Sequence, residues 1–237
     1  MPKIEKYDKK AILYTTAVQL VKQIINSTSK VVVALPTGNT STPLYAQLTQ
    51  DKTIDWSKIS VFMLDCYFPQ EKNDRESFYT YITTHLLDKI YLPAQNFHIL
   101  NSSCANPEFE CQKYEKEILK AGGLDLAILG IGLNGHIAFN EPGTPEDSLT
   151  HLTKLAPQTI KENNSDQKKS FPQYALTMGI HTIMSAKKII VLASGSKKAQ
   201  AVKDALTQPV SSQCPASFLR KHNSVTFLLD KEAAQLL

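Results

Sequence analysis

The sequence has no apolar run long enough to cross a lipid bilayer, and no signal peptide follows its first residues, Met1-Pro2-Lys3. We therefore expect a cytoplasmic protein without a membrane partner. Long basic blocks with interleaved aromatic residues are also missing, because the lysines behind the formal net charge of +4 are interspersed along the chain. This pattern argues against a nucleic-acid partner. The sequence leaves the oligomeric state open and is compatible with a homo-oligomer.

The four cysteines form no C-x-x-C pair, and no histidine stands at zinc-ligand spacing from them. Such spacings are what zinc sites and redox motifs show. We therefore expect reduced thiols, with neither a disulfide nor a bound metal. The cysteines are Cys66, Cys104, Cys111 and Cys214.

With 237 residues the chain can bury a full core, and it shows no internal repeat or low-complexity linker. We expect a single domain over residues 1–237. Short apolar runs alternate with helical patterns, which favours an α/β fold with a Rossmann-like, doubly wound, mostly parallel sheet and helices on both faces. The expected strands are 31–35, 59–64, 97–100, 124–131, 187–193 and 225–229; the expected helices are 9–27, 44–48, 77–87, 106–121, 157–163, 197–206 and 231–237; residues 164–172 are an expected surface loop.

The stretch from Leu124 to Pro142 joins a buried strand to a loop rich in reactive groups. Three glycines interrupt the apolar run and let the backbone turn tightly and approach a ligand. His136 and Glu141 follow, just beyond the carboxyl end of the strand, where open α/β sheets bind their ligands. A loop histidine satisfied by backbone groups is the alternative, and the neighbouring carboxylate favours a functional role.

Gly130, Gly132 and Gly135 also match the dinucleotide-binding pattern G-x-G-x-x-G. That motif requires a helix that opens at its third glycine, whereas residues 136–145 contain two prolines and a further glycine. No acidic residue stands at a strand end about 20 residues further on, where a ribose partner is expected. The context therefore argues against a dinucleotide site.

Three further strand ends carry polar residues. After the first strand, Thr37, Gly38, Asn39 and Thr40 precede a helix, an order that presents backbone N–H groups to an anion; an ordinary turn with a helix cap is the alternative. Asp65 ends the next strand, and after Cys66 and Tyr67 a polar segment, residues 68–76, resembles a lid. Lys198 lies in the first turn of the helix expected at 197–206, where a lysine opposes the helix dipole unless it meets an anion; an exposed lysine is the alternative.

The motif GIGLNGHIAFNEPG, residues 130–143, resembles the signature of the glucosamine-6-phosphate deaminase (isomerase) family, including its galactosamine-6-phosphate branch. The resemblance extends through LPTGNT, LDCY, ALTMGI, SGSKKA and PASFL, which occur in the order that the family has. The related 6-phosphogluconolactonases share the fold, but their histidine motif continues into a Ser-Leu-Phe-Pro-like run. In this chain the corresponding run is Phe139-Asn140-Glu141-Pro142.

The resemblance implies isomerisation of a 2-amino-2-deoxyhexose 6-phosphate to a ketohexose 6-phosphate, coupled to release of ammonia. His136 would open the pyranose ring, with Asn134 and Glu141 setting its tautomer and position. Asp65 would move the proton between C2 and C1. Backbone amides of residues 37–40, with Lys198, would hold the phosphate. Neither a metal nor an organic cofactor is implied.

The sequence departs from the family pattern at three points. Cys66 stands where many glucosamine-type members have glutamate, and Asn134 stands where some have aspartate. Neither change removes a catalytic group. A phosphate-binding arginine found downstream in many members has no match in residues 159–169, where Ser165 is nearest. The absence of this arginine favours the galactosamine branch of the family. Lysines that could substitute as point charges are Lys161, Lys168 and Lys169.

Two other functions fit parts of the sequence. A sugar-phosphate sensor would need a DNA-binding or partner module, and the segment before Val31 has room for about one helix, too little for a helix-turn-helix unit. A lactonase is disfavoured by Asp65 and by the residues after His136.

Overall fold

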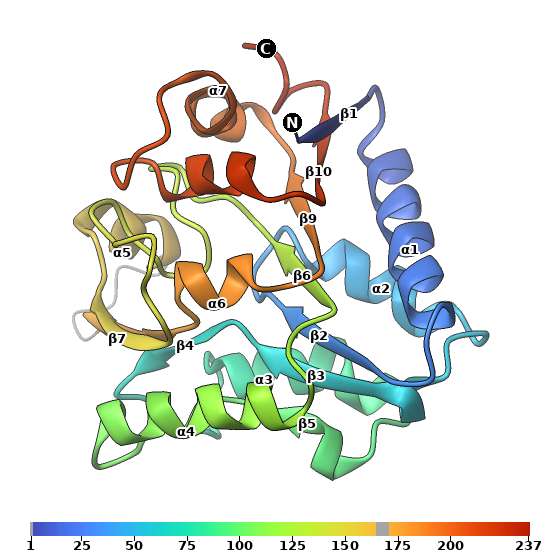
Figure 1. The fold of residues 1–237 in the computed structure, drawn as a ribbon, viewed down its shortest axis with the longest axis vertical. Coiled ribbons are helices and arrows are strands. Elements are labelled where there is room, and N and C mark those ends of the chain that lie inside the picture. Colours follow the sequence, from blue (N-terminus) through green and yellow to red (C-terminus); the bar gives the residue numbers. More distant parts are fainter. Residues whose placement is uncertain (1, 165–170) are drawn as a thin grey trace.

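The computed structural model describes residues 2–164 and 171–237. Its centre is a seven-stranded sheet in which all neighbouring strands pair in parallel (Figure 1). From one edge to the other the strands are β1 (Lys3–Tyr7), β10 (Val225–Asp230), β9 (Lys188–Ala193), β6 (Leu126–Leu129), β2 (Val31–Leu35), β3 (Ile59–Met63) and β5 (Phe97–His98). The expectation of a mostly parallel sheet is confirmed.

Helices cover both faces of this sheet, as its two-sided apolar strands require. In β2, Val31, Val33 and Leu35 pack with one set of helices, whereas Val32 and Ala34 pack with the other. The first set is α1 (Lys10–Asn26), α2 (Thr42–Gln50) and α3 (Phe78–His85); the second is α4 (Pro107–Lys120), α6 (Ile180–Met184) and α7 (Ala199–Thr207). Figure 1 shows α1 and α4 on opposite sides of the sheet. The fold is therefore doubly wound, with a hydrophobic core on each face.

A second, antiparallel sheet of three strands lies beyond the carboxyl ends of β3 and β6, and the sequence analysis did not predict it. Its order is β4 (Asp65–Phe68), β8 (Tyr174–Thr177) and β7 (His151–Lys154). The polar segment expected at residues 68–76 begins at the last residue of β4. Helix α5 (Pro157–Asn163) has the bounds predicted for a short helix, and residues 165–170 of the expected loop lie outside the described residues.

The two ends of the chain also differ from the sequence-based expectation. Strand β1 carries no sequence signal, because an edge strand with three charged residues among five, KIEKY, has no apolar run to mark it. Residues 231–237 form turns instead of the expected helix, since a segment this short gains little from helical hydrogen bonds. The helix expected from Lys197 begins as a 3₁₀ turn, η4 (Ser196–Lys198), so Lys198 directly precedes α7. No helix in the described part of the chain is long and apolar enough to span a membrane.

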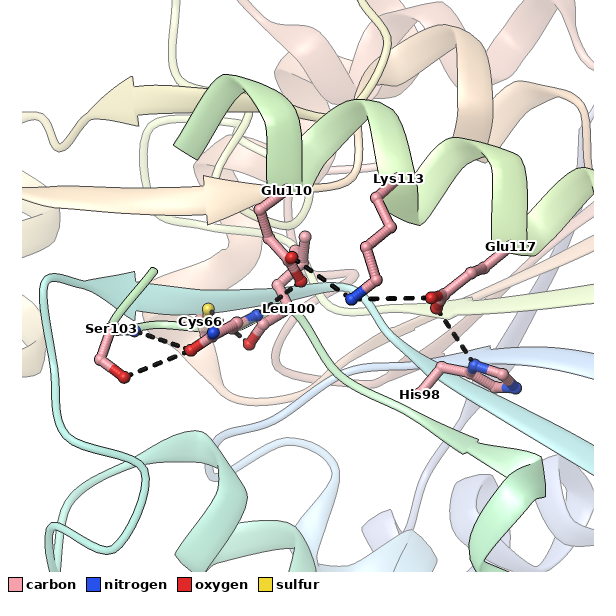
Figure 2. A network of polar contacts seen from close by, with 8 residues as sticks. Cys66, His98, Leu100, Ser103, Glu110, Lys113 and Glu117 are labelled. Carbon is pink, nitrogen blue, oxygen red and sulfur yellow. Dashed lines mark hydrogen bonds and ion pairs between the residues drawn. The ribbon is translucent and has the colours of Figure 1, made fainter. Parts of the chain in front are cut away.

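A polar network ties α4 to the chain around β5 (Figure 2). Oε2 of Glu117 lies 3.4 Å from Nδ1 of His98, and the thiol of Cys66 donates to the carbonyl of Leu100 at 3.6 Å. Because Cys66 belongs to β4, the network also fixes the start of the second sheet. The remaining members are Asn101, Ser103, Glu110 and Lys113.

Strands β2 and β6 lie side by side at the centre of the main sheet. After β2 the chain continues to β3 on one side, whereas after β6 it passes through the second sheet to β9 on the other side. Connections that leave in opposite directions open a crevice at the carboxyl ends of two parallel strands. This is where the predicted site residues of both loops lie.

Candidate active site

A cavity of about 1030 Å³ opens at this crevice, and it is lined by the ends of β2, β3, β6 and β9. Its volume suits a small phosphorylated molecule. The four strand ends that the sequence analysis singled out therefore meet in one place. The predicted site residues that line the cavity are Thr37, Gly38, Asn39, Thr40, Asp65, His136 and Lys198. Asn134 and Glu141 contact each other beside His136.

The imidazole of His136 is held on its Nδ1 side. Nδ1 lies 3.5 Å from Oε2 of Glu141 and 3.4 Å from the hydroxyl of Thr159, which α5 supplies. Nε2 has no hydrogen-bond partner among the described residues, and the side chain lines the cavity. The ring therefore keeps one nitrogen for a ligand while the other is oriented by a carboxylate, an arrangement suited to acid/base chemistry.

The Glu141 carboxylate is ionised although it is buried. Burial alone would raise its pKa, but the hydrogen bond and charge of His136, with hydrogen bonds from Thr159 and Asn134, lower the pKa to about 2. Nδ2 of Asn134 donates to Oε2 at 2.7 Å, and the backbone N–H of Ala156 donates to Oε1 at 3.1 Å. A negative charge is thus fixed beside the histidine.

Asn134 positions His136 through hydrogen bonds to the backbone of the histidine and to Glu141. Its Oδ1 accepts the backbone N–H of His136 at 3.2 Å while its Nδ2 reaches Glu141. The amide therefore joins the backbone of the histidine to the carboxylate that orients the ring. The expected proximity of Asn134, His136 and Glu141 is present, and within the described part of the chain the amide makes no hydrogen bond to the imidazole ring itself.

Gly132 makes room for the imidazole. A Cβ at this position would lie 2.2 Å from Cε1 and 2.3 Å from Nδ1 of His136, far inside van der Waals contact. The backbone N–H of Gly132 also donates to the carbonyl of His136 at 2.9 Å. The glycine spacing that resembles a nucleotide motif is therefore explained by packing of the histidine against the loop that carries it.

Asp65 is a buried carboxylate at the start of β4, with 6% of its surface exposed. Burial raises its pKa to about 7, and no side chain in the described ranges donates a hydrogen bond to it. A carboxylate with a pKa near neutrality that faces the cavity can both accept and return a proton at physiological pH.

Strand β8 holds Asp65 and the histidine loop in fixed relation. Thr177 of β8 pairs with Asp65, and its hydroxyl accepts the backbone N–H of Phe139 at 3.0 Å. The next carbonyl, that of Met178, accepts Nδ2 of Asn140 at 2.9 Å. Sequence reasoning missed Thr177 and Thr159 as supporting residues. Only the ALTMGI motif marked the first, and no local pattern marked the second.

The loop at residues 37–40 offers free backbone donors to the cavity. Gly38 has φ of +94°, a conformation that favours glycine. Within residues 2–164 and 171–237, no group accepts a hydrogen bond from the N–H groups of Thr37, Gly38, Asn39 or Thr40. Several unpaired N–H groups at a concave loop form a typical anion site.

Lys198 faces the same cavity from the other side of the crevice. Burial lowers the pKa of its ammonium group, and the negative charge of Glu162 acts in the opposite sense. Lys161 of α5 also lines the cavity. A lysine has to lie there if its charge is to take the place of the missing arginine. Ser165, Lys168 and Lys169 lie outside the described residues.

Comparison with known proteins places this geometry in context. The family model described as glucosamine-6-phosphate isomerases/6-phosphogluconolactonase matches residues 8–228. The glucosamine-6-phosphate deaminase of Alkaliphilus oremlandii is 40% identical over 98% of this chain and 96% of its own length. That of Clostridium novyi is 41% identical over 92% of each chain.

Solved structures show the same fold. A monomeric glucosamine-6-phosphate deaminase superposes with a TM-score of 0.95 at 36% identity, covering 99% of this chain and 100% of that one. The 6-phosphogluconolactonase of Trypanosoma brucei superposes with a TM-score of 0.82 at 23% identity, covering 100% and 99%. At that identity, the lactonase likeness extends to the fold alone.

Proposed function

Because the chain belongs to the glucosamine-6-phosphate isomerase/6-phosphogluconolactonase family, we propose that it is an enzyme that converts glucosamine 6-phosphate and water to fructose 6-phosphate and ammonia. The observation that carries this assignment is the meeting of two acid/base groups with a phosphate-type loop in one cavity. Asp65 and the His136–Glu141 pair come from different strand ends, and residues 37–40 face them.

In the first step His136 opens the pyranose ring. Its Nε2 takes the proton of the C1 hydroxyl and returns a proton to the ring oxygen, which leaves an open-chain aldehyde. Glu141 stabilises the imidazolium that forms in between, because it stays ionised 3.5 Å from Nδ1. Asn134 and Thr159 keep the ring and the carboxylate in place.

In the second step Asp65 moves a proton along the open chain. The carboxylate removes the proton from C2 and delivers one to C1, which converts the amino aldehyde into a 2-imino alcohol through an enediol-like intermediate. One base can serve both carbons because they are adjacent. Addition of water to the imine carbon and departure of the nitrogen as ammonia then give the ketose phosphate.

The phosphate group anchors the substrate at the opposite end of the cavity. The backbone N–H groups of residues 37–40 donate to its oxygens, and the Lys198 ammonium balances its charge. Lys161 supplies a further positive charge at the cavity wall. The missing arginine leaned toward the galactosamine branch, but the relatives described above carry the glucosamine name, and we assign the gluco epimer.

The test is ammonia release from the two C4 epimers, glucosamine 6-phosphate and galactosamine 6-phosphate, assayed side by side with hydrolysis of 6-phosphogluconolactone. We expect ammonia and fructose 6-phosphate in equal amounts from the gluco epimer, a lower kcat/KM for the galacto epimer and no lactone hydrolysis above the spontaneous rate. Lactone hydrolysis without ammonia release would overturn the proposal in favour of a lactonase.

A further inference from the structure

Three tyrosine hydroxyls hold alternate carbonyl groups of the loop that begins at Pro36. Tyr14 of α1 donates to the carbonyl of Thr40 at 2.7 Å, and Tyr81 of α3 donates to that of Gly38 at 2.8 Å. Tyr45 of α2 donates to the carbonyl of Pro36. Each helix of one sheet face thus contributes one hydroxyl to the same short loop.

These contacts determine where the N–H groups of the loop point. In a planar trans peptide the C=O and N–H groups point in opposite directions. A carbonyl of Pro36 turned toward Tyr45 directs the N–H of Thr37 away from the helices, and a carbonyl of Gly38 turned toward Tyr81 does the same for Asn39. Thr37 and Asn39 line the cavity, and in the described chain no acceptor takes their N–H groups.

Tyr14 interacts with two separate segments of the chain. Its hydroxyl donates to the carbonyl of Thr40 at 2.7 Å, and an interaction with the side chain of Ser194, which lines the cavity at the end of β9, acts to lower its pKa. Burial is the main cause that raises the pKa of Tyr14, so its hydroxyl keeps the proton that it donates. One side chain therefore links the loop after β2 to the segment that leads to Lys198.

We propose that Tyr14, Tyr45 and Tyr81 are positioning residues for the phosphate group that do not touch it. Tyr45 and Tyr81 hold the N–H groups of Thr37 and Asn39 toward the phosphate, and Tyr14 fixes the end of the same loop at Thr40. Tyr14 in addition sets the spacing between this loop and the Lys198 segment. The inference rests on the proposed function for the identity of the ligand, a sugar phosphate. It adds residues outside the cavity, on three separate helices, to the specificity for the phosphorylated substrate.

The three loop carbonyls differ in how far each depends on its tyrosine hydroxyl, and the carbonyl of Gly38 depends on it least. This carbonyl also accepts the backbone N–H groups of Ser41 and Thr42 and the hydroxyl of Ser41, so Tyr81 is one donor among several. The carbonyls of Thr40 and Pro36 have a tyrosine as their side-chain donor. Loss of the Tyr14 hydroxyl should therefore disturb the loop more than loss of the Tyr81 hydroxyl.

The test compares Tyr14→Phe and Tyr81→Phe with Tyr114→Phe as the matched control. Tyr114 is also buried and also donates to backbone carbonyls, those of Met63 at 2.8 Å and His98 at 3.2 Å, but it does not contact the phosphate loop. Calorimetric binding of inorganic phosphate gives a Kd that does not depend on turnover. The KM and kcat for glucosamine 6-phosphate are measured alongside, with Tm as the measure of stability.

We expect Tyr14→Phe to raise the Kd for phosphate and the KM by about three- to tenfold, the range expected for one lost hydrogen bond, with kcat changed less than twofold. Tyr81→Phe should show a smaller change in the same direction. Tyr114→Phe should leave both constants unchanged even if its Tm falls.

An unchanged Kd in both Tyr14→Phe and Tyr81→Phe, or an equal rise in Tyr114→Phe, would overturn the inference, as would a wild-type protein that binds no phosphate. If one variant fails to fold, the other decides. Wild-type protein that binds phosphate but releases no ammonia would refute the proposed function alone. Ammonia release with an unmoved Kd in the variants would refute the positioning role alone.

Discussion

Asn134 and His136 share the oxygen Oε2 of Glu141, which accepts a 2.7 Å hydrogen bond from Nδ2 of the asparagine and lies 3.5 Å from Nδ1 of the histidine. The oxygen that orients the imidazole is therefore itself fixed by an amide from the same loop. Because Asn134 is neutral, Glu141 is the one negative charge that contacts His136 within residues 2–164 and 171–237, and the ionisation of Glu141 matters for both stability and chemistry.

Glu141→Gln should destabilise the protein most near neutral pH. The pKa of Glu141 is lowered from 4.5 to about 2, so its contribution to stability is fully present above pH 4.5 and is lost as pH falls toward 2. The shift corresponds to about 3 kcal/mol. Denaturant unfolding at pH 7 and pH 3 measures this. A difference between variant and wild type that is as large at pH 3 as at pH 7 would contradict it.

Asp65→Asn should stabilise the protein at high pH. The folded-state pKa of Asp65 is raised from 3.8 to about 7, so the carboxyl group favours folding below pH 3.8 and this advantage is lost as pH rises through 7. An amide carries no charge to desolvate. We expect a gain of up to about 4 kcal/mol at pH 8 and little change at pH 3.5, measured by denaturant unfolding. A loss of stability at pH 8 would refute the assigned burial cost.

Gly132→Ala should impair turnover by displacing the imidazole, since its Cβ would lie 2.2 Å from Cε1 of His136. A misplacement of about 1 Å can cost about 10²-fold in rate. We expect a fall in kcat of that order with little change in KM. Gly130→Ala is the control, because among the described residues, apart from its two chain neighbours, no heavy atom lies within 4 Å of its added Cβ. Equal kcat values for the two variants would show that the contact at Gly132 is unimportant.

Lys198→Ala should weaken binding of the phosphorylated sugar and leave weak binding of the unphosphorylated sugar unchanged. Loss of one charge-assisted contact of about 1.5–3 kcal/mol corresponds to a roughly 10- to 150-fold rise in Kd. Lys203→Ala, on α7 but outside the cavity lining, serves as the control. Equal losses for both sugars in Lys198→Ala would assign the lysine a structural role.

The main sheet could be predicted from the sequence because its central strands are buried on both faces. A run such as Val31–Leu35 has no polar residue to confuse with a loop. The three-stranded sheet gave no such signal. Strand β7, for example, alternates exposed and half-buried residues, and β4 pairs with β8 from a distant part of the sequence. Its existence depends on tertiary pairing that no local pattern records.

The chemical groups of the site could be predicted because Asp65 and His136 each follow a buried strand, and parallel strands place their carboxyl ends together. The residues that hold these groups in place could not be predicted. Thr159 reaches Nδ1 of His136 from a separate helix, and Thr177 joins Asp65 to the histidine loop from a separate strand. The local sequence around these two threonines does not indicate that they make these contacts.

The most direct test of the account is kcat/KM for ammonia release from glucosamine 6-phosphate between pH 5 and 9, in wild type and in Asp65→Asn. Because burial raises the pKa of Asp65 to about 7, wild-type activity should fall below about pH 7 as the base becomes protonated. Asp65→Asn should lose about 10²–10⁴-fold in kcat and lack this limb, with phosphate binding preserved. A variant that keeps more than about a tenth of wild-type kcat, or shows the same acid limb, would contradict the role of Asp65 as the base.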